Sequence, residues 1–227
     1  MNNTVSTIFS RALRKIGLAG YRMPGNQSRG TSEGQELKVY WTAAMAEQLE
    51  NWGKDHAWIE IECLLVNCRG KVLDIACGTG VNIVSLSRFE FLDMYGCDIS
   101  DMLIDKAREK GIDPERLKVV DATKTCYLDN EFDYSYSIGS LEHFTEDGID
   151  SFLSECKRYT SKASFHQVPV SRKNIDCGWI RRNQCYFNNS IEWWFEKFHN
   201  QYNDVQVINS GWNDKISVGK WFICRNT

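Results

Sequence analysis

The stretch Lys71–Gly80, KVLDIACGTG, decides the fold of this chain. An apolar run of β type ends at Ile75, and two glycines separated by one residue follow shortly after it. Gly78 and Gly80 allow the backbone to turn tightly and a ligand to approach closely. The segment from Val81 onward has helical character, and its N-terminus would face the same ligand. The stretch therefore predicts a strand, a nucleotide-binding loop and a helix.

The loop sequence D-x-A-C-G-T-G resembles motif I of the class I S-adenosylmethionine (SAM) methyltransferases, and the resemblance continues in register from about Lys71 to Val170. It implies that SAM is the cofactor, that Asp74 lies near its amino-acid end, and that Ala76 and Cys77 line the cofactor with the two glycines. A nicotinamide-binding loop would carry a third glycine where Ile83 stands. As an alternative, Asp74 could only cap the loop by accepting hydrogen bonds from its backbone.

Two further acids follow predicted strands at a similar spacing in the sequence. Asp98 and Asp121 each come one strand and one helix after the preceding acid, so all three would gather at the carboxyl edge of a parallel sheet. The resemblance implies that Asp98 binds the ribose hydroxyls, with Ile99 beside it, and that Asp121 and the Ala122 backbone contact the adenine. Either acid alone could instead be a helix cap or a solvated loop residue.

The loop after the fourth predicted strand carries the sequence Leu-Glu-His and ends that motif at His143. The resemblance implies that this loop lines the methyl-transfer site, with Ser137 at the strand tip beside the cofactor. His143 is the first candidate for a general base, because an imidazole with a pKa of about 6.5 accepts a proton at neutral pH. His166, on the fifth strand, is a second candidate base or substrate ligand. The alternatives are a structural His143 that bonds the neighbouring loop and a buried or rim His166.

The strand pattern predicts an α/β fold with a doubly wound, mostly parallel sheet, and the resemblance implies that the sheet is the seven-stranded, Rossmann-like one of the methyltransferases, closed by an antiparallel pair. With 227 residues, 42% of them hydrophobic, the chain can bury one core. We expect one globular unit made of a helical cap at residues 1–60 and a SAM-binding domain at 61–227, with a lid insertion at 171–202. The expected strands are 72–75, 95–98, 117–121, 131–138, 163–170, 205–208 and 220–224.

The N-terminal segment is basic, with no acid before Glu33. It could be a cap over the active site, a mitochondrial transit peptide if the source is eukaryotic, or a helix on an anionic surface. Residues 36–58 have helical spacing of apolar side chains. By the resemblance, Tyr40 or Trp41 would reach over the methionine part of SAM, although either ring could also face the core.

The insertion before the last hairpin is rich in aromatic residues. Trp194, Phe198 and Tyr202 recur at helical spacing, which predicts a core-facing helix. The preceding stretch mixes cations with aromatics, as a lid that binds a phosphate or carboxylate of the acceptor would, or as a solvated basic loop would. The candidate substrate-binding residues of this stretch are Arg172, Lys173, Trp179, Arg181, Arg182 and Tyr186.

The composition of the chain argues against several classes of function. Nine cysteines without a CxxC pair indicate a reducing compartment and neither structural zinc nor disulfides, so we expect a cytoplasmic protein with no metal. The net charge of −3 argues against the extended cationic surface that nucleic-acid binding requires. No apolar run approaches the roughly 20 residues of a membrane span. We predict a methyltransferase acting on O or N of a small metabolite or sugar, with an anionic acceptor as one option. The alternatives are methylation of a protein or RNA partner and a non-catalytic SAM- or nucleotide-binding module.

Overall fold

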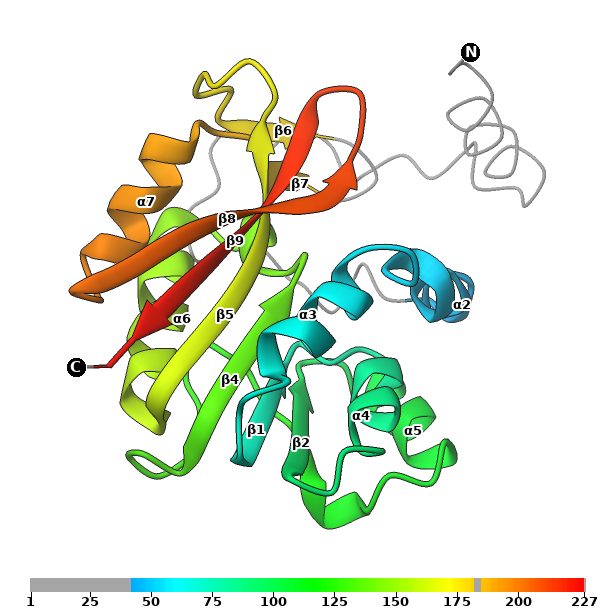
Figure 1. The fold of residues 1–227 in the computed structure, drawn as a ribbon. Coiled ribbons are helices and arrows are strands. Elements are labelled where there is room, and N and C mark those ends of the chain that lie inside the picture. Colours follow the sequence, from blue (N-terminus) through cyan, green and yellow to red (C-terminus); the bar gives the residue numbers. More distant parts are fainter. Residues whose placement is uncertain (1–41, 182–184, 227) are drawn as a thin grey trace. The chain divides into compact units, whose positions relative to one another are not determined.

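The computed structural model describes residues 42–181 and 185–226 of the 227-residue chain, and its centre is a seven-stranded sheet (Figure 1). The strand order is β3-β2-β1-β4-β5-β9-β8. The first five strands are parallel, and β9 and β8 add an antiparallel pair at one edge. The strands are β1 (Gly70–Ile75), β2 (Leu92–Asp98), β3 (Leu117–Val119), β4 (Phe132–Ile138), β5 (Thr160–Ser171), β8 (Asp204–Asn213) and β9 (Ser217–Arg225).

This topology confirms the predicted fold class. The strand order reverses direction at β1, because β2 and β3 lie on one side of it and β4 and β5 on the other. Ligands of doubly wound sheets bind outside the carboxyl ends of the strands at such a reversal. The sheet therefore directs attention to the loops after β1 and β4, which are the glycine loop and the Leu-Glu-His loop of the sequence.

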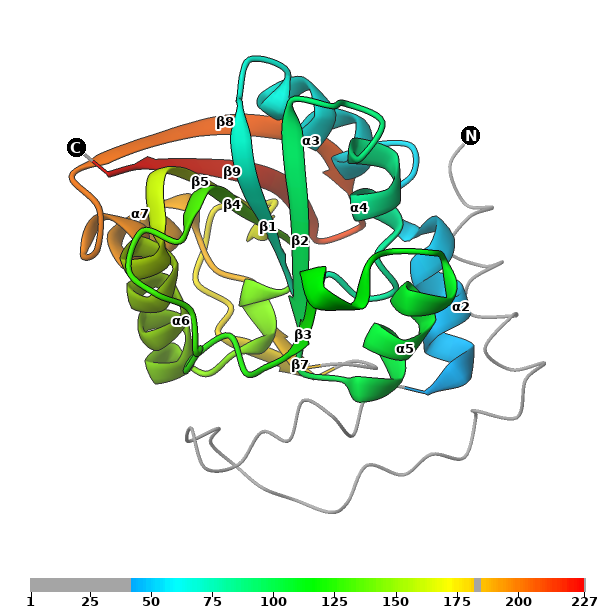
Figure 2. The ribbon, with the colours of Figure 1, turned by 90° about the horizontal axis from the view of Figure 1, so that it is seen from below.

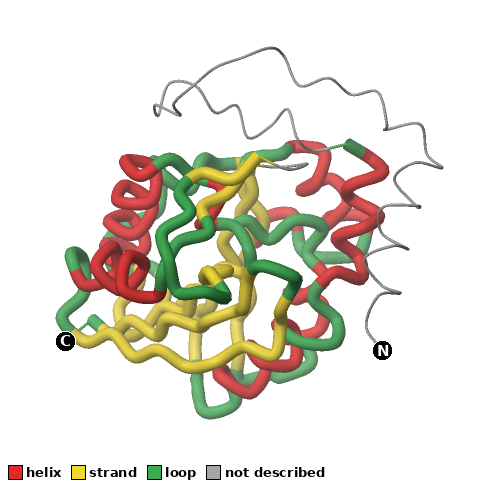
Figure 3. Tube along the Cα trace, turned by 90° about the horizontal axis from the view of Figure 1, so that it is seen from above, coloured by secondary structure: helices red, strands yellow, loops and turns green. Residues whose placement is uncertain are grey.

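Helices cover both faces of the sheet (Figures 2 and 3). One core contains side chains of α3, α4 and α5, and the other contains side chains of α6 and α7. The helices are α2 (Ala43–Trp52), α3 (Ala57–Leu65), α4 (Val81–Leu86), α5 (Asp101–Glu109), α6 (Glu146–Tyr159) and α7 (Ile191–His199), with short 3-10 turns η3 (Pro114–Arg116) and η4 (Leu141–His143).

The start of α5 and the buried face of α7 both follow from local sequence. Ser100 caps α5 by accepting a hydrogen bond from the Leu103 N–H at 3.3 Å, which satisfies one of the unpaired donors at the helix start. In α7, Trp194 and Phe198 are fully buried, and Phe198 stacks on Phe222 of β9 with ring centroids 4.4 Å apart. The helix predicted inside the insertion is thus a core element that packs against the sheet, but it ends at His199, and Tyr202, the third residue of the predicted face, is buried beyond it.

The prediction of one helix over residues 36–58 is wrong where it can be tested. The described part of that range contains one whole helix, α2, a break at residues 53–56, and the start of α3. The Trp58 indole packs across Gly53 so closely that a methyl group there would lie 2.3 Å from its Nε1 atom. Apolar spacing continues through both helices, so the pattern alone hides the turn. Residues 36–41 lie outside the described ranges.

The insertion also contains a small antiparallel ribbon, formed by β6 (Trp179–Arg181) and β7 (Cys185–Phe187). This ribbon contacts η4, the turn that follows β4. Two short pieces of the predicted lid segment, β6 and β7, therefore form a strand pair next to the Leu-Glu-His loop. Within the described residues, no helix is long and apolar enough to cross a membrane.

Candidate active site

The glycine loop leaves β1 in a conformation that few residues adopt. Ala76, Gly78 and Gly80 have φ values of 55°, 55° and 73°, in the left-handed region that favours glycine. A methyl group at Gly80 would lie 2.6 Å from Cδ1 of Ile112, so only glycine lets this turn pack against its neighbours. The turn leads directly into α4, as the sequence predicted.

Asp98 ends β2 and holds the glycine loop. Its carboxylate accepts hydrogen bonds from the backbone N–H of Gly78 at 3.0 Å and of Ser100 at 2.9 Å. Burial raises the pKa of Asp98 to about 6, although these backbone hydrogen bonds oppose the shift. Each carboxylate oxygen has a further lone pair, so the group can still accept hydrogen bonds from a ligand's hydroxyls. Asp98 is buried, so the alternative of a solvated loop acid does not hold for it.

Asp74 lies inside β1 and is only 3% exposed. Its Oδ2 atom has no hydrogen-bond partner, and no backbone N–H of the described residues donates to this side chain. Burial raises the pKa of Asp74 well above its usual range, the Tyr136 hydroxyl opposes this shift, and the nearby charge of Asp98 adds to it. An unpaired buried carboxyl is costly and would be stabilised by a cation. The capping role considered for Asp74 belongs instead to Asp98.

The third acid follows β3 and is exposed. Asp121 accepts hydrogen bonds from the Thr123 backbone N–H and hydroxyl, at 2.9 and 2.8 Å, so it shapes its own turn. Ala122 beside it is buried, and Ile99 after β2 is partly buried. Because β1, β2 and β3 are neighbours in the sheet, the structure brings the three predicted acids to the same edge.

Ser137 and His166 face the core, which corrects the roles expected for their side chains. The Ser137 hydroxyl lies 2.9 Å from Nδ1 of His166, and both residues are fully buried. The imidazole packs between Phe152 of α6 and Phe198 of α7, and burial lowers its pKa to about 3. Strand alternation turns both side chains toward α6 and α7, away from the face that carries Asp74. His166 therefore cannot meet an acceptor at the sheet edge.

His143 lies in η4 and bonds the neighbouring ribbon. Its Nδ1 is 2.8 Å from the carbonyl oxygen of Cys185, which can only accept, so Nδ1 carries the proton of the neutral ring. Nε2 then holds the lone pair. Burial lowers the pKa of His143, which keeps the imidazole neutral, and the ring centroid lies 6.4 Å from that of Tyr186. The structural role and the role of base are both compatible with this geometry.

Glu142, the neighbour of His143, was missed by the sequence reasoning. It is only 6% exposed, and its Oε2 atom has no hydrogen-bond partner. Its Oε1 atom lies 3.8 Å from Nε2 of His143. Burial raises the pKa of Glu142 to about 8. The sequence shows only an acid between Leu141 and His143. As the middle residue of the Leu-Glu-His motif, Glu142 was given no separate role.

Two side chains of α2, Leu49 and Trp52, cover the loops after β1 and β4. The sequence analysis did not single them out. A methyl group at Gly139, the residue after β4, would lie 2.8 Å from the Trp52 ring, and one at Gly78 would lie 3.4 Å from Leu49. Trp52 also approaches Trp212 of β8, with centroids 6.1 Å apart. The end of α2 thus lies over both loops at the carboxyl edge. Tyr40 and Trp41, the aromatics predicted for this role, lie outside the described residues.

The predicted anion-binding lid is only partly described. The Arg172 guanidinium donates to the Asn213 side chain at 3.1 Å and to the Asp214 carbonyl at 2.7 Å, so it fastens the turn between β8 and β9 and is not directed to an acceptor. This corrects the role expected for Arg172. Arg182 lies outside the described residues, as does the side chain of Arg181.

The aromatic residues of that stretch lie in the ribbon. Trp179 packs edge-on against Phe187 with centroids 4.7 Å apart. Tyr186 lies beside His143. The structure therefore brings one predicted substrate residue, Tyr186, to the candidate base.

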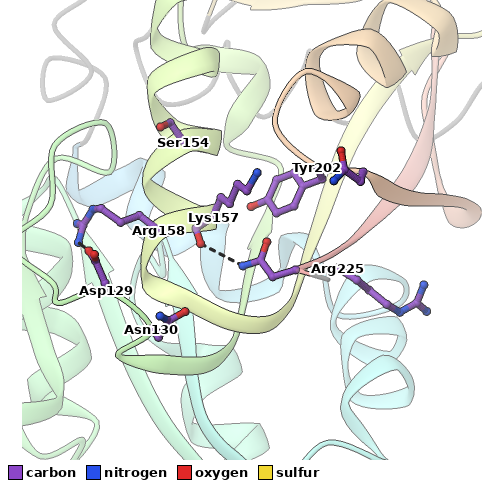
Figure 4. A pocket seen from close by; sticks show the side chains of 9 residues that line it. Asp129, Asn130, Ser154, Lys157, Arg158, Tyr202 and Arg225 are labelled. Carbon is purple, nitrogen blue, oxygen red and sulfur yellow. Dashed lines mark hydrogen bonds and ion pairs between the residues drawn. The ribbon is translucent and has the colours of Figure 1, made fainter.

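A pocket of about 530 Å³ lies elsewhere, at the amino end of β5 and the end of α6 (Figure 4). Its two arginines are already paired with acids, Arg158 with Glu155 at 2.9 Å and Arg225 with Asp204 at 3.0 Å, and Lys157 donates to the Gln201 carbonyl. Parallel sheets bind ligands at the opposite edge. We therefore place the active site at the glycine loop and η4, and not in this pocket.

The residues at the carboxyl edge fit SAM. The orphaned Oδ2 of Asp74 suits the α-ammonium group of the cofactor, and the acceptor-only carboxylate of Asp98 suits ribose hydroxyls. The left-handed turn at Gly78 and Gly80 leaves room for close approach of the backbone. The carboxylates and the glycine turn thus offer the charges, acceptors and space that SAM requires.

The comparison with known proteins agrees with this fit. A family model described as a methyltransferase domain matches residues 72–163, which include β1, the glycine loop, β2 and β4. Residues 72–163 are thus a methyltransferase domain, consistent with the class I SAM-dependent family. The chain is an enzyme of the methyltransferase class, and SAM is its cofactor. The predictions of family, fold, enzyme class and cofactor are confirmed.

Solved structures share the fold of the methyltransferase at low sequence identity. The 1,6-didemethyltoxoflavin-N1-methyltransferase of Burkholderia thailandensis, bound to its substrate and S-adenosylhomocysteine, has a TM-score of 0.65 at 13% identity, over 90% of this chain and 94% of that one. The PH0226 protein of Pyrococcus horikoshii has a TM-score of 0.58 at 19% identity, over 88% and 100%.

A third similar structure is the phosphoethanolamine N-methyltransferase 2 of Haemonchus contortus, solved with phosphomonomethylethanolamine and S-adenosylhomocysteine. Its TM-score is 0.59 at 17% identity, over 74% of this chain and 52% of that one. No curated protein matches the sequence.

Proposed function

We propose that this methyltransferase transfers a methyl group to an oxygen or nitrogen of a small acceptor held beside His143 and Tyr186. The observation that carries the proposal is the orientation of His143. Its Nδ1–H donates to the Cys185 carbonyl of the β6–β7 ribbon, so the lone pair of Nε2 remains available to take a proton. Two of the similar structures are named as methyltransferases of small molecules, which supports a small acceptor.

The cofactor, when bound, supplies an electrophilic methyl group on a sulfonium. We assign its binding to the chain as follows. Asp74 pairs with the ammonium group, Asp98 accepts from the ribose, and the backbone of the loop faces the amino-acid part. The adenine and loop contacts are assigned to Ala76, Cys77, Gly78, Gly80, Ile99, Asp121 and Ala122, and Ser137 contributes only through its backbone.

The cover of the site is assigned to the N-terminal part of the chain, with Leu49 and Trp52 of α2 as its described residues. Their approach to Gly78 and Gly139 supports this assignment. A salt bridge from Glu50 to Lys110, the residue that follows α5, links α2 to that helix at 2.8 Å. The role of residues 1–41 in the cap stays a prediction, because they lie outside the described residues.

The acceptor itself would contact the ribbon and η4. Tyr186, beside His143, supplies an aromatic surface, and Trp179 supports the ribbon through Phe187. An anionic acceptor would depend on Arg181 and Arg182, since Arg172 is engaged in the β8–β9 turn. Removal of the acceptor proton then falls to His143 alone, because His166 is buried in the core.

The test is a screen of acceptors scored by S-adenosylhomocysteine release, followed by His143→Gln on the best acceptor. A general base contributes roughly 10²- to 10⁴-fold, so kcat should fall by about that factor while SAM affinity stays the same. His199→Gln, an exposed histidine of α7, is the matched control and should retain wild-type turnover. Full turnover in His143→Gln at neutral pH would remove the base from the proposal.

A further inference from the structure

Helix α2 lies against the glycine loop, but apolar packing contributes little to its position. Ala46 is its only buried side chain among the described residues, and none of these belongs to either hydrophobic core. Trp52, its largest side chain, is 39% exposed. The next helix, α3, by contrast buries Ala57, Ile61 and Leu65. The place of α2 over the loop therefore depends on the contacts that its last turns make.

Those contacts lie at the glycine loop. A methyl group at Gly78 would lie 3.4 Å from Cδ1 of Leu49, so α2 packs against the first glycine. A methyl group at Gly80 would lie 3.0 Å from Cβ of Ala107, so α5 packs against the second. Thr79, between the two glycines, is only 2% exposed. The loop is thus covered by α2 at one glycine and by α5 at the other.

An ion pair joins the two helices beside this loop, where α2 and α5 lie side by side (Figure 2). The Glu50 carboxylate of α2 lies 2.8 Å from Nζ of Lys110, the residue that follows α5. The Thr79 hydroxyl also interacts with this carboxylate. Burial would raise the pKa of Glu50, but the interactions with Lys110 and Thr79 outweigh it and lower the pKa, so Glu50 is ionised at neutral pH.

The strength of this ion pair decides where it matters. The Lys110 and Glu50 side chains are 29% and 32% exposed. An ion pair of this kind changes an equilibrium by roughly twofold to fivefold. Such a factor is minor for the whole fold, because the two cores stabilise the fold. It is larger in proportion for α2, since this helix has no described side chain in either core.

We propose that Glu50 is a positioning residue of the cofactor site, whose ion pair with Lys110 fastens α2 across the glycine loop and slows the release of the bound cofactor. The proposal rests on the proposed function in one respect, because it takes the cofactor to bind at this loop. It does not depend on the acceptor or on His143. S-adenosylhomocysteine, the product left after methyl transfer, occupies the same loop and is retained by the same pair.

The test measures how fast radiolabelled S-adenosylhomocysteine leaves the full-length protein when unlabelled ligand is added in excess. In Glu50→Gln the dissociation rate should rise roughly twofold to fivefold, because the charge of one partner is lost. In Glu50→Lys it should rise further, since two cations then face each other. The double variant Glu50→Lys/Lys110→Glu restores the pair with exchanged charges, so its rate should fall below that of either single variant. A side chain that only filled space would show no such recovery.

Sodium chloride provides a second readout of the same pair. Interactions between exposed charges are screened over about 10 Å at 0.1 M salt and about 3 Å at 1 M. The ratio of the dissociation rates of Glu50→Gln and the wild type should therefore approach one as the salt concentration rises. Salt also acts on the charges of the ligand itself, but that effect is common to both proteins and cancels in the ratio.

Asp105→Lys is the matched control, because it reverses an exposed acid of α5 that pairs with Arg108 at 2.7 Å, and it should release the ligand at the wild-type rate. Unchanged rates in both Glu50 variants, no recovery in the double variant, or an equal rise in Asp105→Lys would overturn the proposal. If Glu50→Lys does not fold, Glu50→Gln and its salt series decide the question. A wild type that binds no S-adenosylhomocysteine in calorimetry would count against the cofactor assignment as well, so the two failures are distinguishable.

Discussion

Asp98 at the end of β2 accepts a hydrogen bond from the Gly78 backbone at 3.0 Å, across a separation of twenty residues in sequence. The acid assigned to the ribose therefore also fixes the loop assigned to the amino-acid part of SAM. One carboxylate couples the two halves of the cofactor site. Its substitution should affect both the shape of the loop and the binding of the ligand.

Asp98→Ala should weaken S-adenosylhomocysteine binding by roughly fivefold to 150-fold, because losing hydrogen bonds to a charged group costs about 1 to 3 kcal/mol. Calorimetric titration measures the change. Asp101→Ala, which removes an exposed acid three residues later, is the matched control and should bind with wild-type affinity. Equal affinities in the wild type and Asp98→Ala would remove Asp98 from the cofactor site.

Asp98 should also make the stability of the ligand-free protein depend on pH. Its pKa is about 6 in the folded chain, against an ordinary 3.8, so the folded state binds the proton more tightly than the unfolded state. The free energy of unfolding should therefore fall as pH rises from about 4 to about 6. Asp98→Asn does not titrate and should lose this part of the slope. Denaturant titrations of both proteins across that range measure it, and identical slopes would contradict the assignment.

Gly80→Ala should destabilise the fold by about 1 to 3 kcal/mol, since the site combines a left-handed backbone with a methyl group 2.6 Å from Ile112. Gly111→Ala separates the two causes, because Gly111 has a φ of 84° but nothing within 4 Å of the added methyl group. We expect a smaller loss there, from backbone strain alone. Denaturant midpoints compare the two, and a loss at Gly111 as large as at Gly80 would show that the contact with Ile112 is unimportant.

His166→Asn should retain turnover and change only the acid stability. The folded pKa of His166 is about 3, below its ordinary 6.5, so the unfolded chain gains a proton first as pH falls. The folded state should therefore lose stability below about pH 6.5, and asparagine, which does not titrate, should reduce that loss. Asparagine can still bond the Ser137 hydroxyl. Unfolding curves between pH 4 and 7 and the rate of S-adenosylhomocysteine release provide the readouts. A large drop in turnover would return His166 to the catalytic site.

The order of elements could be predicted from the sequence because it depends on local patterns. Apolar strand runs, the glycines at 78 and 80 and the N-cap at Ser100 act within a few residues, and the structure contains all three. The three acids could be placed at one edge because the carboxyl ends of parallel strands meet there. The parallel sheet followed from these signals, whereas its seven strands and the role of the cofactor loop followed from the family resemblance.

Contacts between distant residues were decided only by the tertiary structure. The direction of Ser137 and His166 toward α6 and α7 depends on the pairing of β4 with β5, and the engagement of Arg172 depends on a turn about 40 residues later. The place of Trp52 beside Trp212 depends on how α2 packs over strands that come much later in the chain. In each case the partner of the side chain is decided by packing across the sheet. The adjacent residues in the sequence do not indicate which distant residue that partner is. The sequence by itself determined the fold and the cofactor edge, whereas only the folded chain decided which polar groups at that edge remain available for chemistry.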